Sequence, residues 1–279
     1  MQAIRHFLLA VQFFTRIPIT GRLAHWVGYS PEMLRASAGH FPGVGWIVGS
    51  VAAAVLGAAS MLLPAHAGYS PLVASLLSTL ATVWLTGCFH EDGLADVVDG
   101  LGGSHSKERA LDIMKDSRIG SYGAMAMVLA VHSKVALIAL LASHRLSLAI
   151  AVVLSAHVVA RLWPMLAVRS LPHVGHATQS KSKPLAAFIS RRGLAVCALW
   201  TLPAVLLLAW WQGSALLLPT LLLSAMAALW VRQWLQRRLQ GFTGDGLGAI
   251  EQVSEIAFYL GAALYLGPIG SWLAQAWGT

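Results

Sequence analysis

The chain has 279 residues, of which 57% are hydrophobic and only 11% are charged. Soluble domains are typically about 25% charged, so this composition excludes an ordinary soluble globule, a disordered chain and a coiled coil. The net charge is +8. In so apolar a chain we interpret it as loop charge on one side of a membrane, attracted to anionic headgroups, and we expect no binding to nucleic acid.

One short helix and then seven membrane spans are expected along the chain. Residues 4–17 are amphipathic and are followed by Pro18, which predicts a helix lying on the membrane surface and leaves a partial span open. Later segments are apolar over about 20 residues each, enough to cross the hydrocarbon of a bilayer. They are 42–63, 71–89, 121–142, 146–168, 193–212, 214–235 and 256–277. The fold class predicted is an all-α polytopic membrane bundle, a single domain over 1–279.

The distribution of Lys and Arg predicts the orientation of this bundle. With these spans, the N-terminal segment and alternate loops hold 16 of the 19 basic residues, and the opposite side holds one. Lys134 and Arg161, inside spans, complete the total. The positive-inside rule then places the N-terminus and the loops around 90–120, 169–192 and 236–255 in the cytoplasm.

Acidic residues are gathered in two segments. Ten of the eleven Asp and Glu residues lie at 91–116 or 245–255, and only Glu32 lies elsewhere. The first segment holds Glu91, Asp92, Asp96, Asp99, Glu108, Asp112 and Asp116, and the second holds Asp245, Glu251 and Glu255. Because both segments fall on the predicted cytoplasmic side, we predict catalytic loops at about 90–120 and 241–255.

The spacing in the first segment indicates a metal site. Two sets of acids would each share one helical face: Asp92, Asp96 and Asp99, and Glu108, Asp112 and Asp116. Like charges at this spacing repel each other, and a bound divalent cation would reverse the repulsion. Oxygen ligands favour Mg²⁺, Mn²⁺ or Ca²⁺, and we expect Mg²⁺ if phosphates bind nearby. The alternative is a solvated acidic loop screened by neighbouring Lys and Arg.

The surrounding residues favour a polyphosphate substrate over a merely solvated loop. Residues 115–123 combine Lys, Asp, Ser, Arg and Gly, and Asp245 stands among four glycines at 241–248. In such a site carboxylates hold the metal, basic side chains neutralise phosphate oxygens, and glycines allow the backbone to approach closely.

Several motifs together resemble one known family. They are HEDGLADVVDG at 90–100, ERALDIMKDSRIGSYG at 108–123, FFTRIP at 13–18, FPGVG at 41–45 and TGDGLGAIEQVSE at 243–255. In this order they resemble the adenosylcobinamide-GDP ribazoletransferases, also called cobalamin 5′-phosphate synthases. The resemblance implies an enzyme of the bacterial cytoplasmic (inner) membrane, with its active site facing the cytoplasm. It implies that adenosylcobinamide-GDP is joined to α-ribazole or its 5′-phosphate, that GMP is released, and that Mg²⁺ is required.

The residues and the resemblance suggest roles for individual side chains. The predicted metal ligands are Asp92, Asp96, Asp99, Asp112 and Asp116. Asp116 is also the predicted general base, and His90 is a second catalytic candidate, as ligand or base. The predicted substrate contacts are Lys115, Arg118, Arg16, Asp245, Glu251 and Glu255. For Arg16, an interfacial headgroup anchor is the alternative.

Other readings are weaker but remain open. CDP-alcohol phosphotransferases have a similar Asp pattern and also displace a nucleoside monophosphate, so they are the nearest alternative, by analogy only. A transporter would place its acids at mid-membrane, and within the predicted spans only basic residues such as Lys134 and Arg161 are found. Lys134 is expected either to snorkel or to have a buried partner, and Arg161 to contact phosphate or a corrinoid amide. A homo-oligomer is compatible with the sequence.

Overall fold

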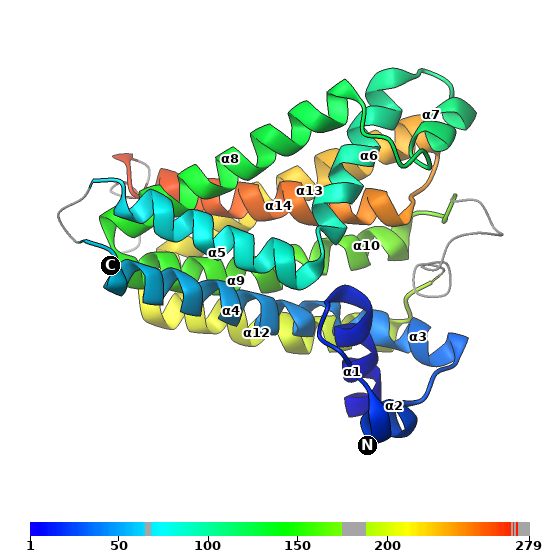
Figure 1. Ribbon diagram of the computed structural model, residues 1–279, viewed down its shortest axis with the longest axis horizontal. Coiled ribbons are helices and arrows are strands. Elements are labelled where there is room, and N and C mark those ends of the chain that lie inside the picture. The colour runs from blue at the N-terminus through cyan, green and yellow to red at the C-terminus, as the bar shows by residue number, and fades with distance from the viewer. Residues whose placement is uncertain (65–67, 175–187, 269, 271, 273–279) are drawn as a thin grey trace.

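The computed structural model describes residues 1–64, 68–174, 188–268, 270 and 272, and within these ranges the regular elements are helices. They are α1 (Gln2–Phe14), α2 (Gly21–Val27), α3 (Pro31–Ser37), the 3-10 turn η1 (Ala38–His40), α4 (Phe41–Leu62), α5 (Ser70–Thr86), α6 (Phe89–Gly103), α7 (Lys107–Ile113), α8 (Ser121–His144), α9 (Leu146–Ala160), α10 (Leu162–Ser170), α12 (Arg191–Gln212), η2 (Ser214–Leu216), α13 (Leu217–Leu239) and α14 (Gly244–Tyr265). The long helices run lengthwise along the molecule, whereas α1–α3, α6 and α7 gather at one end (Figure 1).

The prediction of an all-α polytopic bundle is confirmed. Five stretches are long and apolar enough to cross a membrane, and a sixth span results if the bent pair α5 and α6 is counted as one. The five are Pro31–Leu62, Ser121–His144, Leu146–Ser170, Arg191–Gln212 and Ser214–Leu239. The sequence predicts seven, so this criterion supports one or two fewer among the described residues. Much of the predicted loop at 169–192 lies at 175–187, outside the described residues.

The prediction for the last span is wrong at its start. A helix was expected from residue 256, but α14 begins at Gly244, where the Thr243 hydroxyl accepts a hydrogen bond from the Gly246 N–H at 3.1 Å. This is a side-chain N-cap, which satisfies one of the free N–H groups of the first turn. The segment 241–255 is therefore mostly helix, and Glu251 and Glu255 lie inside the bundle rather than in a loop.

A sharp bend turns α6 across the end of the bundle. The axes of α5 and α6 differ by 87°. Two residues between them, Gly87 and Cys88, have left-handed backbone conformations with φ of 72° and 60°. The Arg16 N–H donates to the Leu85 carbonyl at 2.7 Å and so ties the end of α1 to this bend. The segment expected as a loop from residue 90 is thus largely a helix, α6, and this helix gives Asp92, Asp96 and Asp99 the shared face that their spacing allows.

The N-terminal helices and α14 complete the arrangement around this end. The short helix predicted at 4–17 is confirmed as α1, which packs on α2, α3 and α4. Helix α14 packs against α13, α6, α8 and α9 and is central to the bundle. Its contact with α6 brings the two acidic segments of the sequence together.

Candidate active site

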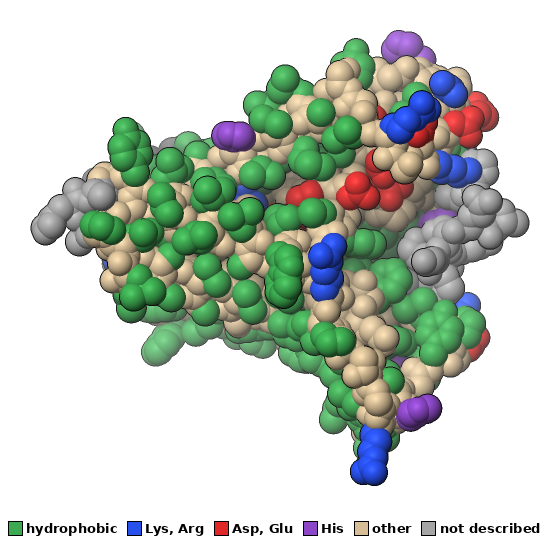
Figure 2. Space-filling model, in the orientation of Figure 1, with side chains coloured by type: hydrophobic (Ala, Val, Ile, Leu, Met, Phe, Trp, Pro, Cys, Tyr) green, Lys and Arg blue, Asp and Glu red, His purple; other side chains and the backbone are tan. Residues whose placement is uncertain are grey.

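Four carboxylates from α6 and α14 form an acidic ridge at the end of the bundle. They are Asp92, Asp96 and Asp99 of α6 and Asp245 in the first turn of α14. Asp92 is exposed, Asp96 and Asp245 are half-buried, and Asp99 is buried. In Figure 2 red acidic side chains gather at this end of an otherwise largely green surface. The fold thus brings the first acidic segment of the sequence together with Asp245.

Glycine at position 93 allows the ridge to form. A Cβ added to Gly93 would lie 2.8 Å from the backbone carbonyl oxygen of Asp245. That is closer than Cβ atoms normally approach an oxygen, so a larger residue would push α6 away from α14. Gly93 follows Asp92 directly, and this close approach holds Asp92 and Asp96 beside Asp245.

The ridge concentrates negative charge without a neutralising partner. Burial is the main reason that the pKa of Asp96 is raised to about 7. The carboxylates of Asp245, Asp92 and Asp99 raise this pKa in the same direction. No member of the ridge forms an ion pair with Lys or Arg in the part of the chain that the structure describes. A hard divalent cation fits this all-oxygen set, although the carboxylates do not converge as tightly as the buried cluster described below.

Asp99 has a second, structural task. Its Oδ2 accepts the Gly120 N–H at 2.7 Å and its Oδ1 accepts the Gly123 N–H at 2.8 Å. These N–H groups belong to the N-cap and first turn of α8. Asp99 therefore caps α8 from another helix, where the helix dipole also favours a negative charge. Any metal ligation by Asp99 would share oxygens that are already hydrogen bonded.

A second set of predicted residues lines a cavity of about 250 Å³ beside the ridge. Its walls come from α6, α7 and the start of α8, and they include Asp99, Arg109, Asp112, Asp116, Arg118, Ser121 and Tyr122. Asp99 is common to the ridge and the cavity. The shared helical face predicted for residues 108, 112 and 116 is only partly present, because α7 ends at Ile113.

Asp116 and Arg118 form an exposed pair at this cavity. Arg118 Nη2 lies 2.5 Å from Asp116 Oδ2, and Arg118 Nε donates to Asp116 Oδ1 at 2.9 Å. The hydrogen bonds from Arg118 lower the pKa of Asp116 to about 2. A carboxylate with so low a pKa is a weak base, so this pairing disfavours the predicted general-base role. Lys115 is exposed on the same turn but does not line the cavity.

Arg16 lies at the α5–α6 bend. A Cβ on Gly87 would lie 2.6 Å from Arg16 Nε, so the guanidinium packs directly against the bend. The side chain is exposed. It is therefore near the start of α6 and free to meet an anion there, although no contact with the ridge carboxylates is present among the described residues.

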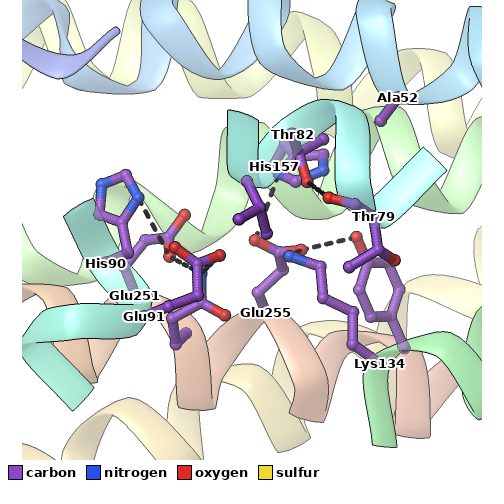
Figure 3. Close-up of polar contacts among 12 residues, drawn as sticks. Ala52, Thr79, Thr82, His90, Glu91, Lys134, His157, Glu251 and Glu255 are labelled. Carbon is purple, nitrogen blue, oxygen red and sulfur yellow. Dashed lines mark hydrogen bonds and ion pairs between the residues drawn. The ribbon is translucent and has the colours of Figure 1, made fainter. Parts of the chain in front are cut away.

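The remaining predicted residues belong to a buried network inside the bundle (Figure 3). This network consists of His90, Glu91, Lys134, His157, Arg161, Glu251, Gln252, Glu255 and Tyr259, all at most 7% exposed. Glu255 is held by Lys134 Nζ at 2.6 Å, His157 Nδ1 at 3.2 Å and the Tyr259 hydroxyl at 2.8 Å.

The other half of the buried network joins α14 to α6. Arg161 Nη1 lies 2.9 Å from Glu251 Oε1, and His90 Nδ1 lies 4.0 Å from Glu251 Oε2. The Gln252 amide donates to Glu91 Oε1 at 3.2 Å and to Glu251 at 3.1 Å. Lys134 and Arg161 thus have buried partners. Glu251 and Glu255 line none of the described cavities.

The buried network contains the tightest group of metal-ligand atoms among the described residues. Ligand atoms of His157, Glu251 and Glu255 all lie within 4.8 Å of one another. However, the ammonium of Lys134 and the guanidinium of Arg161 already lie against the two carboxylates. Because these cations occupy the positions where a metal would gain most, we interpret the group as internal ion pairing.

Comparison with known proteins identifies close relatives. The family model described as Cobalamin-5-phosphate synthase matches residues 6–263. A protein of Polaromonas sp. (strain JS666) named adenosylcobinamide-GDP ribazoletransferase is 55% identical over 95% of this chain and 98% of its own length. Proteins of the same name from Vibrio cholerae (strain O395) and Shewanella amazonensis are 39% and 38% identical, each over 91% of this chain and over 91% and 93% of their own lengths. No solved structure matches the chain.

The capping role of Asp99 predicts a loss of stability that other ridge residues do not share. Asp99→Ala removes both hydrogen bonds to the start of α8, and we expect it to cost about 1–2 kcal/mol of folding free energy. Thermal unfolding in detergent measures this loss. Asp92→Ala serves as the control, because Asp92 is exposed and caps no helix. Equal melting temperatures for wild type and Asp99→Ala would show that the cap is dispensable.

The ion pairs of the buried network predict that removing one charge destabilises the protein more than removing both charges of a pair. Lys134→Met leaves the Glu255 carboxylate without its cation, and we expect a cost of about 3–5 kcal/mol, seen as loss of the folded peak in size-exclusion chromatography. The double variant Lys134→Met/Glu255→Leu removes both charges and should recover a large part of the folded protein. If the double variant is no better folded than Lys134→Met, the pairing does not explain the stability of this region.

Proposed function

The chain belongs to the cobalamin-5-phosphate synthase family, and we propose that it joins adenosylcobinamide-GDP to α-ribazole or α-ribazole 5′-phosphate. GMP would be released, and adenosylcobalamin or its 5′-phosphate would form. The relatives' names supply the donor and the ribazole acceptor. The observation that carries the chemistry is the acidic ridge with its raised Asp96 pKa, next to a cavity with Arg109 and Arg118 in its wall.

We propose that Mg²⁺ binds the ridge through Asp92, Asp96 and Asp245. These carboxylates lack cationic partners in the described chain, whereas the oxygens of Asp99 are bonded to α8. When bound, Mg²⁺ would neutralise charge on the diphosphate of the donor and lower the cost of bringing it to four carboxylates. Asp112 would complete the site from the cavity side, and Asp99, which also lines that wall, would ligate only through oxygens that already bond α8.

The protein's own contribution is positioning and charge neutralisation. Phosphoryl transfer depends mainly on holding the attacking hydroxyl in line with the phosphorus and the leaving group. Arg118 donates two or more hydrogen bonds to Asp116 and is exposed at the cavity, so it can exchange Asp116 for a phosphate oxygen. That exchange would also free the Asp116 carboxylate to accept the proton of the ribazole hydroxyl. Lys115 and Arg16 would supply further positive charge at the rim.

The position of the ridge supports one orientation of the protein in the membrane. The ridge, α7 and the end of α13 with Arg237 and Arg238 lie at the same end of the bundle, since Arg238 Nη1 donates to the Leu101 carbonyl of α6 at 3.1 Å. This is the end with the basic loops, which the positive-inside rule assigns to the cytoplasm. We therefore propose a multi-pass protein of the bacterial inner membrane whose active site faces the cytoplasm.

The activity can be tested with purified protein in detergent or liposomes. Given adenosylcobinamide-GDP and α-ribazole 5′-phosphate, we expect GMP and cobalamin phosphate to form in equal amounts with Mg²⁺, and neither product with excess EDTA. Chromatography with mass detection measures both products. A folded preparation that forms GMP equally well in EDTA would contradict the Mg²⁺ proposal. If no GMP forms with Mg²⁺ or with any other divalent metal tested, the proposal that adenosylcobinamide-GDP is the donor is wrong. CDP-alcohols would be the next donors to test.

Replacement of a ridge carboxylate should stop the reaction without unfolding the protein. Asp96→Asn keeps the size of the side chain but removes a charge from the ridge, and we expect GMP release to fall about 100-fold or more, because metal-held charge stabilisation is worth several kcal/mol. Glu32→Gln is the control, since Glu32 is exposed and its ion pair among the described residues is with Arg35 on α3. Near-normal turnover by Asp96→Asn would remove Asp96 from the metal site.

A further inference from the structure

An apolar groove of about 370 Å³ lies on the side of α6 that faces away from the acidic ridge. Leu94, Val97 and Val98 of α6 form part of its wall. At 100° per residue these side chains point to the opposite side of the helix from Asp92 and Asp96. Helix α6 therefore separates a highly charged surface from a wholly apolar one.

The other walls come from α8 and α13, which can cross the membrane, and from α14. Ala126 and Ala130 of α8 contribute small side chains, and Trp230 and Trp234 of α13 contribute large ones. Both α8 and α13 are among the five apolar spans. Trp230 is 61% exposed in the protein alone, so the groove has an open side that would face the bilayer. Every residue in its wall is apolar, so water would gain almost no hydrogen bonds there.

Next to the groove, α13 also presents a positive charge. Trp230, Trp234 and Arg237 are spaced i, i+4 and i+7, so they share one face of the helix. The two indole rings are stacked with their centroids 5.9 Å apart. Arg237 is exposed in the last turn of α13 and makes no ion pair among the described residues. In contrast, Arg238 is already bonded to the Leu101 and Ser104 carbonyls of α6.

We propose that this groove binds an anionic phospholipid, with one acyl chain between α6, α8 and α13 and the headgroup phosphate on Arg237. The apolar wall and the position between two spans favour a hydrocarbon chain, which is the apolar molecule available inside a bilayer. Arg237, which has no ion pair in the described part of the chain, favours an anionic headgroup, and the stacked tryptophans favour a position at the membrane surface. The bound chain would pack against the underside of the helix that carries the ridge. This proposal concerns lipid binding and does not depend on the reaction proposed above.

Lipid retention by the purified protein tests the proposal. Native mass spectrometry after reconstitution in nanodiscs of equal phosphatidylglycerol and phosphatidylcholine should show wild-type protein retaining phosphatidylglycerol. Arg237→Gln should weaken the preference for phosphatidylglycerol about fivefold, since one arginine near a membrane surface contributes about that factor. Arg22→Gln, an exposed arginine on α2, should leave the preference unchanged.

A second pair of variants tests the groove itself. Ala130→Trp would fill the groove and should abolish lipid retention, whereas Ala136→Trp places the same bulk on an exposed part of α8 outside the groove and should not. The proposal is overturned if wild type retains no phospholipid, if it retains both lipids equally, or if Ala130→Trp retains as much as Ala136→Trp. Wild type and Arg237→Gln decide the result even if Ala130→Trp does not fold.

Discussion

The pairing of buried charges around α14 is the constraint on which the rest of the structure depends. Glu251 and Glu255 are completely buried in an apolar bundle, where an unpaired carboxylate would cost several kcal/mol. Lys134 of α8 and Arg161 at the end of α9 supply the compensating charges. These ion pairs determine which helices pack around α14 and where α14 lies along its own axis relative to those helices. Apolar contacts alone specify such positions poorly, because in a bilayer the lipid chains compete with them.

The position of α14 in turn determines the acidic ridge. Gln252 links Glu251 to Glu91 in the first turn of α6, and one residue further on Asp92 begins the acidic face of that helix. The absence of a side chain at Gly93 lets the two helices meet beside Asp245. Asp99 then links α6 to the start of α8 through its two hydrogen bonds. One short helix thus connects the interior charge pairs, the ridge and the next membrane helix.

Much of this could be predicted from sequence, and the failures have physical causes. Composition and apolar segment length indicate the membrane bundle, and the i, i+4, i+7 spacing of Asp92, Asp96 and Asp99 indicates the acidic face of α6. The start of α14 was missed because its first turns contain glycines and acids, which are typical of a loop unless a cap such as Thr243 is recognised. The burial of Glu251 and Glu255 depends on Lys134 and Arg161, far away in the chain. Spacing within one segment cannot reveal such partners.

The two groups of acidic residues in this molecule differ in how far neighbouring cations neutralise their charge, and this difference indicates different roles. In the buried network, Lys134 lies against Glu255 and Arg161 lies against Glu251, so little charge remains for a metal to neutralise. At the ridge, Asp92, Asp96, Asp99 and Asp245 have no cationic partner among the described residues, and burial together with the neighbouring carboxylates raises the pKa of Asp96. The close geometry of His157, Glu251 and Glu255 is therefore less informative than the uncompensated charge of the ridge. A cation gains most where carboxylates lie together without side chains to neutralise them, and in this fold that place is also the accessible one.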